Sequence, residues 1–320
     1  MQPHIPVLVD EVIASLALHD DAMIVDGTFG AGGYSEAVLS SSKARIIALD
    51  RDPSVQPHVE RLRQLYGARF AFHAGCFSQM PQILAHTLPV HGIMLDIGVS
   101  SMQLDTPDRG FSFRFDAPLD MRMEQQGRSA ADIVNSTPEE ELASLLWHYG
   151  EERASRKIAR AIIAQRAIEP LSTTRQLRDL IHRIIPPRGA TIDPATRTFQ
   201  ALRIVVNDEL GELTHGLEAA EQILAPQGRI AVVTFHSLED RIVKHFLRDA
   251  EHREEHGTRH RPAPISEQQA PIFHSVTRKP IVATDDACRH NPRARSAKLR
   301  VAERTSAPAR TIKQGRTNYA

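Results

Sequence analysis

A glycine-rich turn that follows a short apolar run constrains the fold more than any other feature of this sequence. Residues 22–25 lead into Asp26-Gly-Thr-Phe-Gly-Ala-Gly-Gly33. Glycines let a backbone turn sharply, adopt positive φ and approach a ligand closely. At the end of the first strand of an open α/β sheet, such a turn is where nucleotide-like ligands bind. The sequence therefore predicts an open α/β sheet with a ligand site at the carboxyl ends of its strands.

Four more apolar runs share this lack of polar alternation: residues 45–49, 68–73, 92–95 and 229–235. Runs of this kind are typical of strands buried on both faces of a parallel sheet. The spacing of the first three leaves room for crossover helices, which predicts a βαβ pattern. The gap between Asp96 and Arg229 is too long for one crossover, so we expect an inserted helical module there.

Helix signals occupy this gap. Thr137-Pro138-Glu139-Glu140 is typical of an N-cap, a first-turn proline and a capping-box acid. A second helix is expected before Pro186-Pro187, and the charge run 153–160 is expected on a solvated helix face. One long helix with a continuous apolar face is expected from Phe199 to Leu224, where it returns to the sheet.

The C-terminal part is expected to complete the sheet. Ser237 should cap a helix that ends near Ala250, and residues 251–269 predict a charged surface loop. Residues 273–282 and 296–303 predict a final antiparallel strand pair, and residues 306–320 lack apolar periodicity and predict a disordered tail.

Composition excludes several classes of protein. Formal net charge is +0, so nucleic-acid binding would have to rest on local patches. Cys76 and Cys288 are the only cysteines and neither lies in a paired-cysteine motif, which argues against disulfides and against a zinc site and fits a reducing cytoplasm. No apolar run approaches the ~20 residues of a membrane helix. We expect a cytoplasmic protein without metal or membrane contact.

The acids around the turn favour one ligand over another. Asp50 ends the second run, about 20 residues after the glycines, where a carboxylate can accept hydrogen bonds from ribose hydroxyls. The strict Gly-x-Gly-x-x-Gly fingerprint of dinucleotide sites is absent, and Asp26 stands directly before the turn. A pyrophosphate disfavours nearby negative charge, whereas the cationic S-adenosylmethionine suits it. Asp96 adds an acid to the same pocket, and Asp26 could equally be a structural cap.

A series of longer motifs runs from His4 to about Thr305. They are His4-x-Pro-Val-Leu-x-x-Glu11, Asp26-Gly-Thr-Phe-Gly-x-Gly-Gly33, Asp50-Arg-Asp-Pro53, Asp96-x-Gly-Val-Ser-Ser-x-Gln-Leu-Asp105, Arg109-Gly-Phe-Ser-Phe113, Pro118-Leu-Asp-Met-Arg-Met123, Tyr149-Gly-Glu-Glu-Arg153, Pro194-Ala-Thr-Arg-Thr-Phe-Gln200, Phe235-His-Ser-Leu-Glu-Asp-Arg241 and Asn291-Pro-Arg-Ala-Arg-Ser296. In these motifs the sequence resembles the bacterial 16S ribosomal RNA cytosine-N4 methyltransferases.

The resemblance implies a class I, Rossmann-like methyltransferase with a mostly parallel seven-stranded sheet and an inserted all-helical domain for substrate recognition. The domains would be 1–108 and 195–305 for the methyltransferase, 109–194 for the insertion and 306–320 for the tail. Cofactor contacts are implied at Gly32, Gly33, Tyr34, Asp50, Phe77, Asp96 and Gln103. Tyr34 and Ala117 stand where the family is expected to have His and Gly.

The implied reaction is methylation of a cytosine amino nitrogen in 16S rRNA of the small subunit, in the decoding region. Because that amino group shares its lone pair with the ring, an acceptor for its protons is needed. Asp96 and His236, each at the end of an expected strand, are the candidates for catalysis. The acid- or Asn-Pro-Pro-aromatic motif of DNA amino methyltransferases does not match Asp96-Ile-Gly-Val99, and a structural role for His236 remains equally open.

RNA contacts are expected from arginines, because phosphate contacts position a nucleic acid. Arg293 and Arg295 lie with Lys298 and Arg300 in an acid-poor cluster, and Arg109 and Arg122 lie near three phenylalanines. Those rings could stack on an unpaired base or could anchor the insertion to the core. Small basic patches would bind naked RNA weakly, so we expect the substrate to be the small subunit or a late precursor.

Other interpretations stay open. The chain could be a non-catalytic RNA-binding or assembly protein that keeps the cofactor pocket, or an amino methyltransferase that acts on another nucleic acid. A small-molecule methyltransferase is disfavoured by the insertion and the arginine clusters, and a nicotinamide-dependent dehydrogenase by the order of the glycines. The sequence leaves open a homodimer, the exact nucleotide and the identity of the proton acceptor.

Overall fold

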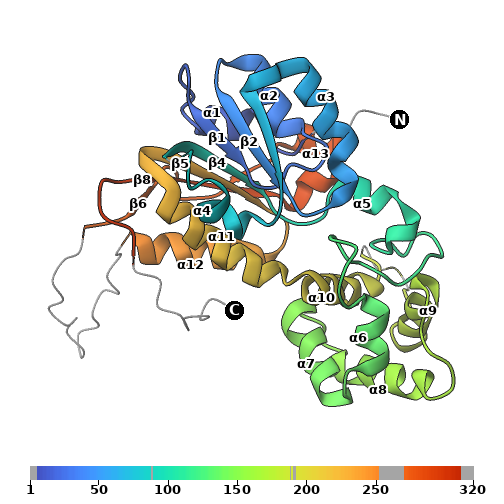
Figure 1. Ribbon diagram of the computed structural model, residues 1–320. Helices are drawn as coiled ribbons and strands as arrows, with labels where there is room; N and C mark the ends of the chain where they lie inside the picture. The colour runs from blue at the N-terminus through green and yellow to red at the C-terminus, as the bar shows by residue number, and fades with distance from the viewer. Residues whose placement is uncertain (1–5, 88, 188, 190–191, 252–269, 311–320) are drawn as a thin grey trace, which may run out of the picture. The chain divides into compact units, whose positions relative to one another are not determined.

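The computed structural model of the protein describes residues 6–87, 89–187, 189, 192–251 and 270–310 (Figure 1). The chain forms two compact units. One comprises Met1–Gly98 and Leu210–Ala320, and the other is Val99–Glu209. The inserted unit therefore begins earlier and ends later than the expected 109–194.

The first unit is built on one sheet of eight strands with the order β3-β2-β1-β4-β5-β8-β6, in which β7 pairs with β8. The strands that pair in parallel are β1 (Met23–Asp26), β2 (Arg45–Asp50), β3 (Phe70–Ala74), β4 (Val90–Asp96) and β5 (Leu224–Thr234). The antiparallel strands are β6 (Phe273–Ser275), β7 (Ile281–Val282) and β8 (Lys298–Arg304). The expected parallel βαβ sheet with an antiparallel end is confirmed. The strand expected over 273–282 is two short strands, β6 and β7, which both pair with β8, so the sheet has eight strands among the described residues where seven were expected.

Apolar side chains explain why the central strands are buried on both faces. Ile24, Ile93 and Val232 are at most 2% exposed, as parallel strands covered by helices require. The helices of this unit are α1 (Val9–Ser15), α2 (Gly33–Ser41), α3 (Gln56–Tyr66), α4 (Met80–Ile83), α11 (Glu209–Ile223), α12 (Ser237–Ala250) and α13 (Asp285–His290). Strand order reverses between β1 and β4, so the carboxyl ends of these two strands form the switch point where open α/β sheets bind ligands.

The second unit is helical, as expected. Its helices are α5 (Ser101–Asp105), α6 (Ala130–Ser136), α7 (Glu139–Gly150), α8 (Ser155–Arg166), α9 (Thr174–Ile184) and α10 (Ala195–Asn207). Leu142, Leu177 and Phe199 contribute to its own apolar core. The N-cap of α7 is Pro138 and not Thr137, because Thr137 belongs to the end of α6, where its N–H bonds to the Ile133 carbonyl. The helix before Pro186-Pro187 is confirmed.

The single long helix expected from Phe199 to Leu224 is wrong. It is two helices, α10 and α11, interrupted at Asp208, which has a left-handed φ of 47°. The N–H of Asp208 bonds to the Ile204 carbonyl and closes α10, and Asp tolerates this conformation better than most residues. Leu224 is the first residue of β5 and not the end of a helix.

The C-terminal predictions have mixed outcomes. Of the expected charged loop, residues 252–269 lie outside the described residues, as do 311–320 of the expected tail. The described tail residues are bound to the first unit. Arg310 pairs with the buried Glu221 at 2.5 Å and lies over the Phe246 ring. Within the described part of the chain, no helix combines the length and the apolar character that crossing a bilayer requires.

Candidate functional site

The glycine-rich turn joins the ends of three neighbouring strands. The Gly27 N–H donates to the Met94 carbonyl in β4, and the Phe29 N–H donates to the Leu49 carbonyl in β2. The Thr28 hydroxyl accepts the N–H of Asp96 at 2.7 Å. These bonds hold the turn at the β1–β4 switch point.

Glycine is required at two positions of the turn. Gly32 has a φ of 81°, and a Cβ on it would lie 2.8 Å from the Phe29 ring. A Cβ on Gly33 would overlap the ring of Pro6. The N-terminal motif therefore packs directly on the turn, and neither of these two positions has room for a side chain.

Tyr34 contributes to packing in this region. It lies in the first turn of α2 and is buried, and its hydroxyl donates to the Val7 carbonyl. Burial raises the pKa of its phenol well above the ordinary value, so the group stays neutral. Its side chain thus fastens the N-terminal segment to α2, and a cofactor contact of Tyr34 stays a prediction.

Asp50 links the end of β2 to the turn. Its Oδ2 accepts the Gly30 N–H at 2.7 Å, and its Oδ1 accepts the Asp52 N–H at 2.8 Å. Burial raises the pKa of Asp50 to about 6 in spite of these bonds. An ionised carboxylate has about four acceptor positions, so two remain for ribose hydroxyls.

Asp26 has structural partners. It accepts the Ser35 hydroxyl at 2.7 Å and the Thr28 N–H at 3.2 Å. Burial raises its pKa to about 6. Of the two roles left open for this acid, the structure supports capping of the turn.

Asp96 differs from both acids, because its buried Oδ1 has no hydrogen-bond partner among the described residues. Burial, then the charges of Asp26 and Glu239, raise the pKa of Asp96 well above its ordinary value. A buried acceptor without a partner costs free energy unless a ligand satisfies it. This oxygen is therefore a candidate contact for a ligand with a positive charge or a donor group.

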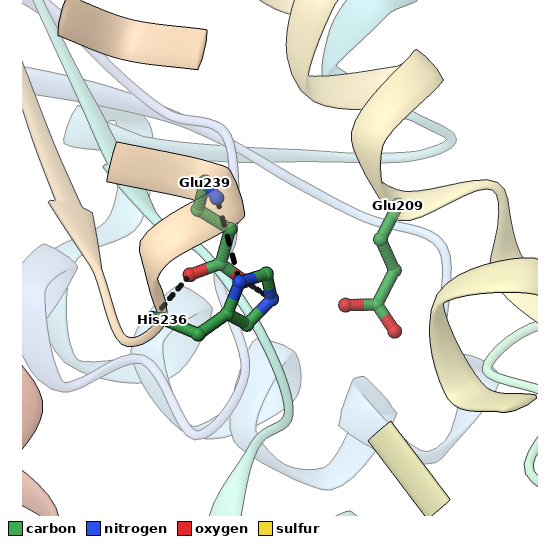
Figure 2. Close-up of side chains that lie close together, drawn as sticks. All are labelled: Glu209, His236 and Glu239. Carbon is green, nitrogen blue, oxygen red and sulfur yellow. Dashed lines mark hydrogen bonds and ion pairs between the residues drawn. The ribbon is translucent and has the colours of Figure 1, made fainter. Parts of the chain in front are cut away.

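His236 caps α12, with Glu239 as its partner (Figure 2). Its Nδ1 accepts the Glu239 N–H at 3.4 Å, and its Nε2 lies 2.9 Å from Glu239 Oε1, an ion-pair distance that is not aligned as a hydrogen bond. The side chain of Glu239 is 0% exposed and accepts the N–H groups of Phe235 and His236. The expected cap at Ser237 is wrong by one residue, because His236 is the N-cap and Ser237 is already helical.

Three side chains in Figure 2 are of types that can bind a metal ion: Glu209, His236 and Glu239. Glu209 belongs to the helical unit, where Arg203 binds both of its oxygens at 2.7 and 2.9 Å. Backbone N–H groups already occupy one oxygen of Glu239. Protein donors thus already occupy these carboxylates at least in part, and the expected absence of a metal stays a prediction.

Phe77 lies beside the glycine-rich turn. A Cβ on Gly27 would be 2.9 Å from the Phe77 Cβ, and the Gly75 N–H donates to the Asp50 carbonyl. Gln103 lies in the helical unit, where its Oε1 accepts the Ser100 N–H at 3.0 Å in the capping box of α5. The first unit thus gathers the glycines, Asp50, Phe77 and Asp96.

Arg109 and Arg122 are engaged inside the helical unit. Arg109 donates to the carbonyls of Arg122 and Met123 at 2.9 and 3.0 Å and lies over the Phe111 ring. Arg122 pairs with Asp120 at 2.6 Å. Neither guanidinium extends freely toward a partner, and their role as RNA contacts stays a prediction.

The phenylalanines near these arginines have different surroundings. Phe111 is buried and Phe113 packs against Phe199 within the core of the helical unit, whereas Phe115 is 51% exposed. The structure therefore supports an anchoring role for the first two rings. Only Phe115 is placed as a stacking surface would require.

The C-terminal basic cluster is not acid-poor, which corrects that expectation. Asp240, on α12, accepts from Lys298 at 3.0 Å and from Arg300 at 2.7 Å. Arg295 is exposed and Arg293 is half-buried in the 3₁₀ helix Pro292–Ser296. The chain folds Asp240 onto β8 from far away in sequence, which a local count of charges cannot reveal.

Several residues of the site were missed by sequence reasoning. Thr28 and Glu239 lie inside quoted motifs, and their polar side chains next to a strand end were the available signal. Nothing in the local sequence pointed to Glu212, because Ser78, the residue that it contacts beside Phe77, is remote in sequence.

Comparisons with known proteins identify the family of this chain. Residues 1–305 match the MraW methylase family. Ribosomal RNA small subunit methyltransferase H of Paramagnetospirillum magneticum is 54% identical over 310 residues, which is 96% of this chain and 98% of that protein. The protein of the same name from Rhodospirillum centenum is 54% identical over 319 residues, 97% of this chain and 94% of that protein.

A solved rRNA methylase from Streptococcus thermophilus superposes with a TM-score of 0.40 and 10% identity over 93% of this chain and 94% of that chain, a likeness too loose to bear on substrate. The family match spans nearly the whole chain, both compact units included. This chain belongs to the MraW methylase family.

Proposed function

We propose that this protein transfers the methyl group of S-adenosylmethionine to the N4 amino nitrogen of a cytosine in 16S rRNA of the small ribosomal subunit. The observation that carries the proposal is the β1–β4 switch point, where a closely packed glycine turn meets the carboxylate of Asp50 and the buried Oδ1 of Asp96. The substrate follows from relatives named as small-subunit rRNA methyltransferases, at 54% identity over nearly the full chain.

The groups at the switch point suit the cofactor in their hydrogen-bonding capacity and charge. Gly32 and Gly33 let Phe29 and Pro6 pack closely on the turn, and Asp50 keeps acceptor positions for the ribose hydroxyls. Phe77 offers an apolar face beside the turn for the adenine ring. Asp96 Oδ1, buried and without a described partner, is a suitable acceptor for the positive amino group or for the substrate. Bound S-adenosylmethionine supplies an electrophilic methyl group.

The work of the protein is then alignment, exclusion of water and removal of one proton. As the new N–C bond forms and the S–C bond breaks, the amino nitrogen must lose a proton. We assign its acceptance to Asp96, because a carboxyl group with a raised pKa is a stronger base than an ordinary one. The cationic cofactor favours the ionised state in which Asp96 can accept that proton.

His236 supports this site indirectly in our proposal. Its ring caps α12 and pairs with Glu239, and the Glu239 charge acts on Asp96. Glu239 and His236 thus set the electrostatic surroundings of Asp96 from the end of β5. Arg293 and Arg295 are proposed to contact phosphates, since Arg295 is exposed and the neighbouring Lys298 and Arg300 are paired with Asp240.

A transfer assay tests the function. The protein would be mixed with labelled S-adenosylmethionine and small subunits from cells that lack the enzyme, and the digested nucleosides resolved by mass spectrometry. We expect label in N4-methylcytidine, and none with Asp50→Ala. Cofactor binding without transfer to subunits, precursors or free RNA would instead support a non-catalytic assembly role. Equal transfer to free rRNA would contradict the expectation that a structured ribonucleoprotein is the substrate.

A further inference from the structure

The segment that carries Phe77 is a short turn with little regular structure of its own. It connects β3 to α4 through the 3₁₀ helix Phe77–Gln79. At its start the Gly75 N–H donates to the Asp50 carbonyl, and the Gln79 side chain accepts the Cys76 N–H at 3.1 Å. These bonds fix the ends of the turn, but neither restrains the ring of Phe77.

A second restraint comes from α11. Glu212 Oε1 accepts the Ser78 N–H at 2.9 Å, across 134 residues of sequence. Ser78 directly follows Phe77 and lies in the first turn of the 3₁₀ helix, whose N–H groups have no partner within the helix. A carboxylate at this position is a stronger acceptor than a neutral group.

One helical turn further along α11, Gly216 receives the ring itself. A Cβ built on Gly216 would overlap Cδ2 and Cε2 of Phe77. Gly27 also lies against Phe77, because a Cβ on Gly27 would be 2.9 Å from the Phe77 Cβ. Residues 212 and 216 share one face of the helix because they are four positions apart. That face therefore holds both the backbone and the ring of the Phe77 turn.

We infer that Glu212 and Gly216 are positioning residues for cofactor binding, which act by fixing Phe77 between α11 and the glycine-rich turn. This inference rests on the proposed role of Phe77 as a wall of the cofactor pocket. Gly216 is not explained by helix stability, because glycine in a helix interior costs about 1 kcal/mol relative to alanine. Its presence at this contact fits the need for space beside the ring.

The first test distinguishes the hydrogen-bond acceptor of Glu212 from its negative charge. Glu212→Ala removes the acceptor of the Ser78 N–H, whereas Glu212→Gln keeps an acceptor oxygen without the charge. In a Cys288→Ser background, alkylation of Cys76 reports the mobility of the turn and calorimetry reports the Kd for S-adenosylmethionine. We expect Glu212→Ala to speed Cys76 alkylation and to raise the Kd, each by about 10-fold, and Glu212→Gln to change each by less than about 3-fold.

The second test addresses the ring. Gly216→Ala should raise the Kd by about 10-fold although it favours the helix. The same change in a Phe77→Leu background should have little effect, because leucine lacks the contacting Cε2 and can rotate its methyl groups away from residue 216. Glu218→Gln, on the same helix, is the matched control and should behave as the parent protein. Melting temperatures measured in parallel separate loss of binding from loss of folding.

The outcomes distinguish the positioning role of Glu212 and Gly216 from the proposed cofactor contact of Phe77. If Phe77→Ala leaves the Kd unchanged, the proposed cofactor contact of Phe77 fails, and the positioning role fails with it. If Phe77→Ala weakens binding but Glu212→Ala and Gly216→Ala match the Glu218→Gln control in Kd and in Cys76 alkylation, the positioning role alone is overturned. Equal effects of Gly216→Ala in the parent protein and in the Phe77→Leu background would also overturn it.

Discussion

The hydroxyl of Thr28 accepts the backbone N–H of Asp96 at 2.7 Å, and this bond connects the glycine-rich turn to the acid at the end of β4. Both residues stand at strand ends on either side of the switch point. The bond satisfies a part-buried donor. It fixes the backbone that carries the buried Oδ1 of Asp96, an oxygen without a partner among the described residues. One threonine thus links the position of the glycine-rich turn to the position of the proposed proton acceptor.

Replacing this threonine should disturb both functions. We expect Thr28→Val to lower the free energy of unfolding by about 1 kcal/mol, because the Asp96 N–H loses its acceptor while side-chain volume is kept. The Kd for S-adenosylmethionine should rise as the turn loosens. Thr28→Ser keeps the hydroxyl and serves as the control in urea unfolding and calorimetry. Valine and serine variants with equal stability and affinity would show that the bond contributes nothing measurable.

The strands and the turn were predictable because their signal is local. Continuous apolar runs identify strands that are buried on both faces, and the glycines mark the turn wherever the rest of the chain goes. The break at Asp208 was not predictable in this way. The apolar period continues across it, and the features that close α10 are the left-handed conformation of Asp208 and the contacts of Asn207 with Met121 and Met123.

The residues of the site also divide into those with a local sequence signal and those that depend on remote contacts. Asp50 could be identified because it directly follows an apolar run in the sequence. Its bond to Gly30 lies within a single βαβ unit, so the signal is local. Asp240 pairs with Lys298 and Arg300 only once β8 has folded against β5 and α12. The sequence alone therefore suggested a basic cluster without nearby acids, which the fold does not have. Similarly, Ser237 looked like the helix cap by residue type, whereas a histidine takes that place because the buried Glu239 orients its ring.

The carboxyl groups of the pocket should make the cofactor-free protein more stable in mild acid. Burial raises the pKa of Asp26 and Asp50 from 3.8 to about 6. The folded state therefore holds protons that the unfolded state releases. Their stabilising contribution is complete below pH 3.8 and is lost as the pH rises through about 6.

Urea unfolding over this range checks the sign. The free energy of unfolding should fall with rising pH by an amount on the order of 1–3 kcal/mol per group. Asp50→Asn should reduce the slope, and saturating S-adenosylmethionine should flatten it, because a cationic ligand favours ionised carboxylates. A slope that Asp50→Asn leaves intact would show that Asp50 does not hold the proton.

Tyr34 can be exchanged for the histidine expected in the family. Its hydroxyl binds the Val7 carbonyl and its ring is buried, so the side chain belongs to packing. We expect Tyr34→His to lower the melting temperature while the Kd for S-adenosylmethionine stays within about 3-fold of the parent value, and Tyr34→Phe to cost about 1 kcal/mol of stability through the lost bond. Thermal unfolding with and without cofactor measures both quantities. A large loss of affinity in Tyr34→Phe, which keeps the ring, would place the hydroxyl in the cofactor site instead.

Asp96 and His236 can be separated by a pair of asparagine variants. Asp96→Asn keeps the shape of the side chain but removes the proposed proton acceptor, so kcat should fall by about 10²- to 10⁴-fold with a smaller effect on cofactor Kd. His236→Asn places another good N-capping residue before α12, and if the ring acts mainly as a cap, kcat should change by less than about 10-fold. Single-turnover methylation of small subunits, with N4-methylcytidine measured against time, compares the two. A larger loss of kcat in His236→Asn than in Asp96→Asn would move the proton-accepting role to the histidine, with Glu239 as the group that orients it.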